Sequence, residues 1–320
     1  MAIPPGHGIF PGALPLARRD QDQGATGAMP LVNMKPLLRD AMDNGYAVAA
    51  FNLVDYGTTK AMVAAAEELN APVICQTSAK TIQYWSHKEI ASWVRTVAED
   101  SPVPVVLHLD HCKDLAMIEA CARAGWTSIM IDASELPFED NLEMSKRVRG
   151  IAEKYGVGME AELGQIMGVE DDMHVAEEDS VLTDPQDAKR FCDALDLSAF
   201  ACAVGTAHGF YHGEPNVDFD RIEAINRLTR TPMALHGGTG LSDETFRKAI
   251  ERGSAKINIS TNLKHVFVES FVDYHTAKPS DFEPLRLIDA QYQACKTMFA
   301  GFIEKFGGKD RAPAYLAKAA

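Results

Sequence analysis

The stretch HLDHC (108–112) places two histidines, an aspartate and a cysteine within five positions. Imidazole and carboxylate groups at this spacing suit a metal site, whereas a thiol beside a histidine suits a nucleophile with its base. A third interpretation is that these side chains are buried for structural reasons. The choice depends on the element that carries the stretch and on the other side chains that the fold brings near it.

Two further histidines stand beside small residues, His208 in GTAHG (205–209) and His236 in HGGTG (236–240). A lone histidine is more often structural, but three histidines at equivalent places in a fold favour a shared role. Three neutral imidazoles suit Zn²⁺, with one coordination position left open for substrate. We therefore predict one catalytic zinc ion held by His111, His208 and His236.

Short runs rich in Val, Ile and Ala alternate with amphipathic stretches along most of the chain, a pattern that predicts a parallel sheet with covering helices. Eight such repeats predict an α/β fold, a single (β/α)8 TIM barrel. The alternative is an open doubly wound sheet, which the absence of a GxGxxG turn after the first run disfavours. The runs are AVAAFN (47–52), PVICQTS (72–78), PVVLHLD (104–110), SIMIDAS (128–134), GMEAELG (158–164), AFACAVG (199–205), PMALHGG (232–238) and AKINIS (255–260).

Function in such a barrel is expected at the C-terminal ends of the strands. Solvent contact alone explains Ser or Asn at a strand end, but it explains less readily the convergence of histidines and acids on one rim. Asp110 ends its strand beside a predicted ligand, so we expect it to exchange a proton with a substrate oxygen. The polar strand ends are Asn52, Ser78, Asp110 with His111, Asp132, Glu162, His208, His236, and Asn258 with Thr261.

The loops after the seventh and eighth runs are expected to bind phosphate. HGGTG offers backbone N–H groups and the Thr239 hydroxyl, and NIST (258–261) adds an amide and two hydroxyls. Backbone N–H groups hold a phosphate without a cluster of lysines, which fits an acidic chain.

A long acidic segment, LGQIMGVEDDMHVAEEDS (163–180), follows the fifth run. A loop of this length in a barrel is often a lid. Glu170 is a candidate for acid–base chemistry, whereas Glu177, Glu178 and Asp179 are better explained as solvated charges.

Composition bounds the class of protein. The 320 residues are 46% hydrophobic and 24% charged, with a formal net charge of −14, so we expect a soluble protein without a broad nucleic-acid surface. No apolar run reaches the roughly 18 residues that span a bilayer, so no membrane partner is expected. The six cysteines are dispersed without a CxxC pair, a pattern typical of reduced thiols in a cytoplasmic protein.

The two ends of the chain differ from the barrel pattern. Residues 1–28 are rich in Pro, Gly and Ala and predict a flexible N-terminal extension, with Met29 as a hypothetical true start and residues 29–320 as the TIM-barrel domain. The segment 281–308 predicts an extra long C-terminal helix with a broad apolar face. Core packing is the default for this face, and burial against another subunit is the alternative.

The motifs HLDHC, EAELGQIMGVEDD, GTAHGFY, HGGTG and INIST occur in this order, one per strand end. Together they resemble the class II, metal-dependent ketose-bisphosphate aldolases, the family of fructose- and tagatose-bisphosphate aldolases, over residues 29–313. The resemblance implies a carbon–carbon lyase. It implies reversible retro-aldol cleavage of a ketose 1-phosphate or 1,6-bisphosphate to dihydroxyacetone phosphate and an aldehyde, through a zinc-stabilised enediolate.

The resemblance also assigns roles to residues. His111, His208 and His236 would hold the zinc, and Glu162 would be a nearby or alternative ligand. Asp110 would handle the proton of the aldehyde-derived hydroxyl, and Glu170 the proton at the carbanion carbon. The substrate- and phosphate-binding positions would be Asn52, Ser78, Gly209, Gly237, Thr239, Asn258, Ser260 and Thr261.

Further implications concern partners and substrate. The family forms dimers and tetramers, and some members bind a monovalent cation near the phosphate loops, an alternative that stays open here. Ser260 stands where fructose-bisphosphate aldolases often carry Asp, and Val169 precedes Glu170 where they often carry an acidic pair. Both departures favour the tagatose-like branch. Lys264 and Arg286 are candidates for a second phosphate contact, and the aldehyde half of the substrate stays open.

Three other activities compete with this prediction. A Schiff-base aldolase would need a lysine at the barrel mouth, but Lys256 precedes INIST. A metal-dependent hydrolase would use Asp132 and Glu162 with a second metal. A non-catalytic sugar-phosphate sensor would not need Asp110 and Glu170. Within HLDHC, we expect His108 to be structural and Cys112 to be a packing residue.

Overall fold

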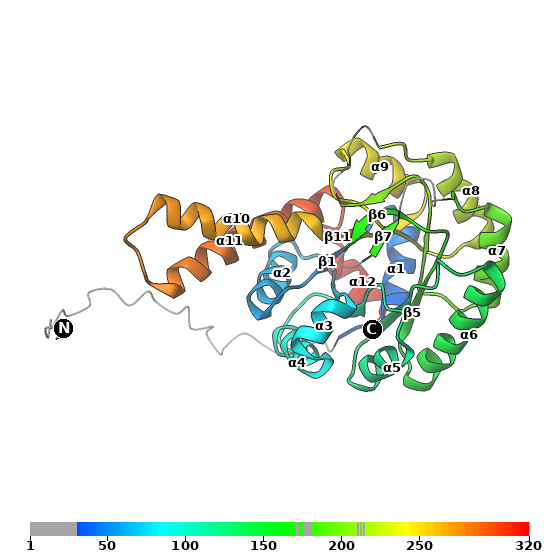
Figure 1. The fold of residues 1–320 in the computed structure, drawn as a ribbon, viewed down its shortest axis with the longest axis horizontal. Coiled ribbons are helices and arrows are strands. Elements are labelled where there is room, and N and C mark those ends of the chain that lie inside the picture. The colour runs from blue at the N-terminus through cyan, green and yellow to red at the C-terminus, as the bar shows by residue number, and fades with distance from the viewer. Residues whose placement is uncertain are drawn as a thin grey trace, which may run out of the picture.

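The computed structural model describes residues 31–170, 173–175, 181–209, 211, 213 and 215–319. Within this part of the chain, eight parallel strands close into a barrel in the order β1-β2-β3-β4-β5-β8-β10-β11, and β11 returns to β1 (Figure 1). The predicted (β/α)8 barrel is confirmed. The strands are β1 Val48–Asn52, β2 Val73–Thr77, β3 Val105–Leu109, β4 Ser128–Ile131, β5 Gly158–Leu163, β8 Ala199–Cys202, β10 Met233–Leu235 and β11 Ser254–Ile259.

The predicted runs extend past several strand ends, and at the end of β4 a polar side chain bonds locally. The predicted run 128–134 contains β4, but β4 ends at Ile131. The carboxylate of Asp132 then accepts hydrogen bonds from the backbone N–H and the hydroxyl of Ser134. Such local side-chain bonds compete with the ladder and turn the chain away from it.

The barrel interior changes from apolar to polar along the strands. Alternate residues of a strand share one face, and Val48, Ile74, Val106 and Met130 cluster with buried side chains of α1 (Met34–Asp43). Because the buried side chains of α1 pack against this interior cluster, α1 closes the apolar end of the barrel. Two residues beyond Val106 on the same face stands His108, where the interior becomes polar.

Helices form the outer layer, and several of them begin at capping residues. Asp55, Asp114, Asp184 and Ser242 each accept a backbone N–H of the following first turn, which satisfies a donor that the helix itself leaves unpaired. The outer helices are α2 Tyr56–Glu68, α3 Ala79–Trp85, α4 His87–Ala98, α5 Leu115–Arg123, α6 Phe138–Tyr155, α7 Pro185–Ala194, α8 Phe219–Thr229, α9 Asp243–Glu251 and α12 Ala312–Ala319.

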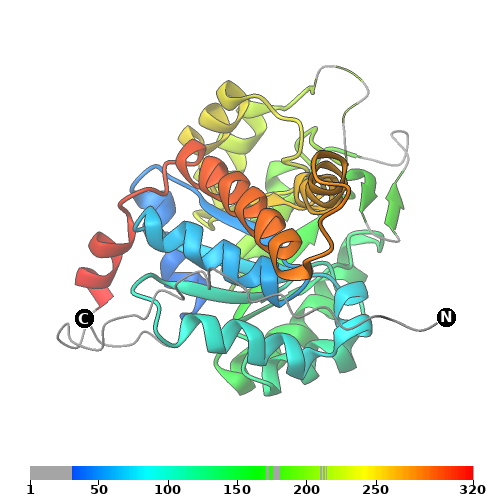
Figure 2. The same cartoon turned by 90° about the vertical axis from the view of Figure 1, so that its left-hand side faces the viewer.

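Helices α10 (Thr261–Ala277) and α11 (Pro284–Lys305) form a hairpin that projects from the barrel (Figure 1). Figure 2 shows the half of α11 that does not project, which lies beside α2. The long C-terminal helix is thus present. Core packing, however, holds only for its second half, which buries Cys295, Phe299 and Ile303. The projecting part exposes apolar side chains, namely Val268, Val272, Phe282, Leu285 and Ile288.

The predicted extension, residues 1–28, lies outside the described residues. Among the helices of the described ranges, none combines the length and apolar character needed to cross a membrane.

We predict that Phe51→Ala will destabilise the protein by about 3–5 kcal/mol, because it removes a large side chain from a closed interface. Phe51 is fully buried on the outer face of β1, with its ring centroid 4.7 Å from that of Phe299 on α11. Chemical denaturation measures the change in the free energy of unfolding. Tyr84→Ala, at a side chain that is 78% exposed, is the control, and an equal loss in both variants would contradict the assignment.

Candidate metal centre and active site

Three histidines from different parts of the barrel meet at its mouth. His111 follows β3, His208 ends β9 (Ala207–His208) and His236 follows β10. All three are buried, and each offers a ring nitrogen within 4.8 Å of those of the other two. The ring centroids of His111 lie 5.0 Å from His208 and 4.6 Å from His236. The structure therefore brings together the three predicted ligands.

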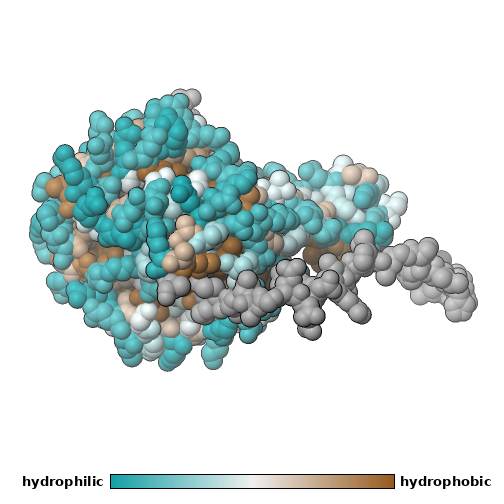
Figure 3. All heavy atoms as spheres, turned by 180° about the vertical axis from the view of Figure 1, so that it is seen from behind, coloured by the Kyte–Doolittle hydropathy of each residue, from teal (hydrophilic) through white to brown (hydrophobic). Residues whose placement is uncertain are grey.

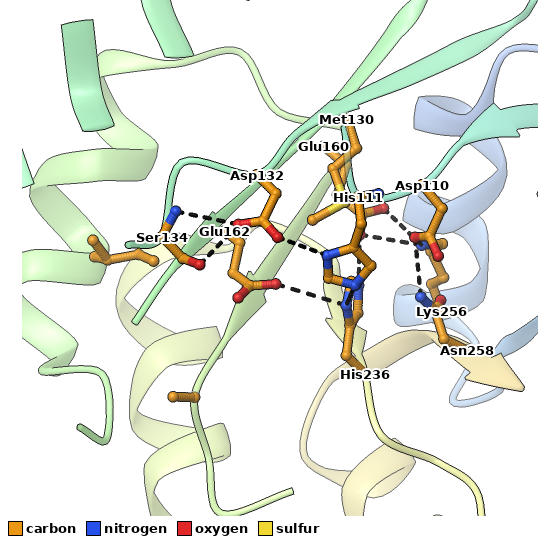
Figure 4. A network of polar contacts seen from close by, with 12 residues as sticks. Asp110, His111, Met130, Asp132, Ser134, Glu160, Glu162, His236, Lys256 and Asn258 are labelled. Atoms are coloured by element: carbon orange, nitrogen blue, oxygen red, sulfur yellow. Dashed lines mark hydrogen bonds and ion pairs between the residues drawn. The ribbon is translucent and has the colours of Figure 1, made fainter. Parts of the chain in front are cut away.

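Carboxylates fix the orientation of two of these rings (Figure 4). His111 Nδ1 lies 2.9 Å from Asp132 Oδ2, and His236 Nε2 lies 2.9 Å from Glu160 Oε1. Each ring therefore turns its other nitrogen toward its neighbour, and His111 Nε2 lies 2.8 Å from His236 Nδ1. In metal sites, a carboxylate commonly holds the ring nitrogen that does not bind the metal.

The backbone of His111 is strained in support of this arrangement. Its φ is +42°, in the left-handed region that residues other than glycine seldom adopt. Its N–H points to Met130 Sδ at 3.3 Å on the neighbouring strand β4. Strain of this kind persists where the surrounding structure fixes it, and it clusters at functional sites.

The charges around the cluster favour protonation of His111 over the other two rings. Burial opposes protonation of His111, but the charges of Asp110, Asp132 and Glu162 outweigh it and raise its pKa well above the usual value. Burial, followed by the charge of His111, lowers the pKa of His208 to about 3 and that of His236 well below its usual value. A cation is thus favoured at this position.

The donor set fits Zn²⁺. Zn²⁺ commonly takes imidazole nitrogens as ligands, and one ring nitrogen of each of the three histidines lies within 4.8 Å of the others. Glu162 lies beside them, with its Oε2 3.7 Å from His236 Nδ1. Burial and the charge of Asp132 raise the Glu162 pKa well above its usual value. Its position agrees with the predicted nearby or alternative ligand.

Asp110 is fully buried and is held by two amide groups. Its Oδ1 accepts from Asn258 Nδ2 at 3.1 Å, and its Oδ2 accepts from Gln76 Nε2 at 3.0 Å. The same Gln76 nitrogen donates to Asn52 Oδ1 at 2.8 Å. Of the predicted substrate positions, Asn258 thus contacts Asp110 directly, and Asn52 connects to it through Gln76, which the sequence analysis missed. The signal available in the sequence was Gln76 itself, a polar residue two positions before Ser78 inside an apolar run.

The predicted phosphate loops lie close to the histidines. Gly237 has φ +70°, and a side-chain carbon there would meet the Ala207 carbonyl oxygen at 2.4 Å. The Tyr211 hydroxyl donates to the Gly237 carbonyl and accepts from the Ala207 N–H, so it ties the loops that follow β8 and β10. This close packing explains why glycine stands after His236.

The N-terminus of α10 offers donors beside these loops. Its N-cap residue, Ser260, makes no side-chain capping bond, and its buried Oγ has no hydrogen-bond partner among the described residues. The first N–H groups of a helix have no intrahelical partner and attract anions. Thr261 begins the helix, and Thr239 is buried in the loop after His236.

The described part of the predicted lid segment contains two short strands. Strand β6 (Met167–Glu170) pairs antiparallel with β7 (Met173–Val175) and parallel with β9, which places Gly168 opposite His208. A side-chain carbon at Gly168 would meet the His208 carbonyl oxygen at 2.2 Å. The Glu170 backbone belongs to β6, but its side chain and residues 171–172 and 176–180 lie outside what the structure describes.

The remaining candidates occupy varied places. Gly209 has φ +87°, and Ser78 is buried at the start of α3. The charge of Lys264 contributes to the lowered pKa of His208, so Lys264 lies near the site. Arg286 instead pairs with Asp281 at 3.1 Å on the projecting hairpin. Burial raises the pKa of the Cys112 thiol to about 11, as expected for a packing residue.

Comparison with known proteins agrees with this geometry. The model of the family "Fructose-bisphosphate aldolase class-II" matches residues 32–311. The chain belongs to this family. A sulfofructosephosphate aldolase from Alkalicoccus urumqiensis is 34% identical over 287 residues, which cover 90% of this chain and 100% of the relative. The resemblance inferred from the five motifs is confirmed, and the chain is a lyase.

Two solved structures of similar proteins share the fold. The YdjI aldolase from Escherichia coli K12 is 29% identical with a TM-score of 0.78, covering 88% of this chain and 99% of that one. A putative fructose-1,6-biphosphate aldolase from Coccidioides immitis is 27% identical with a TM-score of 0.79, covering 87% and 97%. These two structures therefore superpose on this chain along nearly their whole length.

We predict that zinc affinity will rise with pH through the neutral range. Without metal, the raised pKa of His111 keeps its ring protonated below that pKa, so binding must displace a proton. Affinity should therefore rise about tenfold per pH unit, continuing above pH 6.5, until the His111 pKa is passed. Chelator competition between about pH 6 and pH 8 measures the slope. Asp132→Asn should flatten it, and a flat profile for the unaltered protein would contradict the prediction.

Proposed function

We propose that this class II aldolase is zinc-dependent and reversibly cleaves a ketose 1-phosphate or 1,6-bisphosphate to dihydroxyacetone phosphate and an aldehyde. The observation that carries the proposal is the set of facing imidazole nitrogens beside Asp110. Residues 29–320 are proposed to form the single catalytic domain. The six cysteines are buried free thiols, which supports the proposed cytoplasmic location.

Zinc bound by His111, His208 and His236 would act as a Lewis acid that stabilises negative charge on the ketone oxygen and the adjacent hydroxyl. Asp110 takes the proton from the hydroxyl of the carbon that becomes the aldehyde. As that C–O bond becomes a carbonyl, the carbon–carbon bond breaks and its electrons pass to the ketone half. Glu170 is proposed to deliver a proton to the carbon that receives them.

The amide contacts explain how Asp110 can serve as the base. Both of its oxygens accept from amide N–H groups, so the carboxylate is held in one orientation. Asn258 joins Asp110 to the strand whose C-terminal end begins the phosphate loop, and Asn52 joins through Gln76. A substrate whose phosphate sits at Ser260 and Thr261 would therefore have its chain placed between those loops and Asp110.

The phosphate of the ketone half is proposed to bind the Gly209, Gly237 and α10 backbone. This choice is supported by the uncapped start of α10 and by the buried Ser260 hydroxyl. The chain has a formal net charge of −14, so local donors, rather than a broad cationic surface, must hold the anion. The monovalent cation raised by the family resemblance stays a prediction.

The other half of the substrate is proposed to carry an anionic group at its far end. The relative from Alkalicoccus urumqiensis is named for a sulfofructosephosphate, so a sulfonate and a phosphate are the two anions to compare. Lys264, in the first turn of α10, is the candidate contact near the site. Arg286 lies on the projecting hairpin, so any role for it would involve another subunit.

A panel of ketose 1-phosphates with phosphate, sulfonate or hydroxyl at C6 tests the proposal, with coupled detection of dihydroxyacetone phosphate. We predict zinc-dependent release that EDTA abolishes and zinc restores. His208→Ala should lower kcat by at least about 100-fold, because it removes a metal ligand. His275→Ala, an exposed histidine on the hairpin, is the matched control and should retain activity.

Three results would each contradict the proposed function. Activity that survives both EDTA and His208→Ala would exclude the zinc mechanism. Phosphate release without carbon–carbon cleavage would select a hydrolase. Tight binding of sugar phosphates without turnover would select a sensor.

We also propose that the chain forms homodimers or homotetramers through the α10–α11 hairpin. Figure 3 shows apolar side chains on the hairpin as it extends away from the barrel. Phe282 is 83% exposed and Leu285 73% exposed. Large apolar side chains gathered on a protruding element commonly mark an interface between proteins.

We predict that Leu285→Asp will lower the molar mass measured by light scattering after gel filtration, because it places a charge in the proposed interface. Thr276→Asp, at an exposed polar position on the same hairpin, should leave the mass unchanged. A monomeric unaltered protein, or the same mass for both variants as for the unaltered protein, would refute the assignment.

A further inference from the structure

A lysine and a glutamate are buried together beneath the histidine cluster. Lys256 on β11 and Glu160 on β5 have no exposed surface. Lys256 Nζ lies 3.1 Å from Glu160 Oε1 and 2.9 Å from Oε2. Moving two charges out of water is costly, and an apolar pair of similar volume is often at least as stable. Stability alone therefore does not explain why these charges occupy the barrel interior.

Glu160 connects this ion pair to a predicted zinc ligand. Its Oε1 lies 2.9 Å from His236 Nε2 as well as 3.1 Å from the Lys256 ammonium. A carboxylate oxygen only accepts hydrogen bonds, so the His236 proton must be on Nε2 for this contact to form. His236 Nδ1 is then left as the nitrogen that faces His111. Lys256 anchors the carboxylate that sets this orientation.

The same ammonium reaches the proposed base. Lys256 Nζ lies 3.7 Å from Asp110 Oδ1, the oxygen that also accepts from Asn258. Figure 4 shows Lys256 and Asn258 on the same side of the Asp110 carboxylate. One cation thus lies between the carboxylate that orients a metal ligand and the carboxylate that moves a proton.

The ammonium also accounts for a second cluster of metal-type ligands. His108, Asp110 and Glu160 lie close enough together to hold an ion. Lys256, however, already supplies a positive charge to both carboxylates, and His108 Nε2 lies 3.4 Å from Glu160 Oε2. His108 is fixed from its other side by Ser128 Oγ at 2.9 Å. This position is therefore filled by a built-in cation, which disfavours a metal ion among His108, Asp110 and Glu160.

We propose that Lys256 and Glu160 are positioning residues for the retro-aldol reaction: Glu160 sets the His236 ring for zinc, and Lys256 sets the Asp110 carboxylate for proton transfer. This inference rests on the proposed zinc aldolase function. It separates two effects, because the Glu160 contact acts on metal binding and the Lys256 contact acts on turnover.

Two double variants separate these effects from the cost of an unpaired buried charge. Lys256→Met with Glu160→Gln removes both charges but keeps an oxygen that accepts from His236. Lys256→Met with Glu160→Met removes that oxygen as well. Circular dichroism and the thermal midpoint of each zinc-free variant establish that it folds. Zinc affinity is then measured by chelator competition, and kcat and KM are measured on the best substrate of the panel.

We expect the zinc affinity of the Met/Met variant to be about 10–100-fold below that of the Met/Gln variant, as is usual when a metal-bound histidine loses its supporting carboxylate or amide. Both variants should show a kcat at least about tenfold below that of the unaltered protein, with KM changed less than about twofold. Equal zinc affinities in the two variants would overturn the role of Glu160. An unchanged kcat in the Met/Gln variant would overturn the role of Lys256.

The zinc measurement keeps this test independent of the proposed activity. If the unaltered protein cleaved no ketose phosphate, the proposed function would fail while the Glu160 role could still be upheld by the affinities. If the unaltered protein were active and both variants behaved like it, the positioning role would fail alone. Should the Met/Met variant not fold, the kcat of the Met/Gln variant still decides the Lys256 assignment.

Discussion

The site depends on carboxylates that hold the outer nitrogens of two histidine rings. Asp132 holds Nδ1 of His111, and Glu160 holds Nε2 of His236, so the rings present different nitrogens to the space between them. Free rotation of either ring would separate the two facing nitrogens. Placing acids this deep in a protein is costly unless positive charge lies nearby. His111 supplies that charge to Asp132, and Lys256 supplies it to Glu160.

The closed barrel makes this compensation of buried charge possible. Parallel strands with evenly spaced pairing bring alternate residues of neighbouring strands to one interior level. Along β3 that interior face carries Val106, then His108, and Asp110 just beyond the strand. Apolar packing against α1 closes one end, a layer of compensated charge follows, and the proposed ligands and base stand at the open end. The loops above this layer then carry the glycines and helix N-terminus that suit a phosphate.

Much of this arrangement follows from the sequence. The eight apolar runs predict the barrel, and polar strand ends predict the rim where the three histidines meet. Gln76, Glu160 and Lys256 were not identified as site residues, because each stands one strand repeat below the rim, where only strand interiors were expected. The alternation of inward- and outward-facing residues along a buried strand would have identified them, because each stands two residues before a polar strand end. The projecting hairpin also escaped prediction, because an apolar helix face does not reveal whether its own barrel or another subunit covers it.

The buried ion pair also separates two ways of breaking the same carbon–carbon bond. A Schiff-base aldolase needs a neutral lysine amine that can reach the substrate carbonyl. Lys256 is instead fully buried, with its ammonium in contact with Glu160 and close to Asp110. Burial and these two contacts hold Lys256 away from any substrate carbonyl and so oppose its use as a nucleophile. The histidines at the rim face the opposite constraint, because the acids around them favour a cation there. The buried acids thus disfavour lysine chemistry at Lys256 and favour a cation among the histidines.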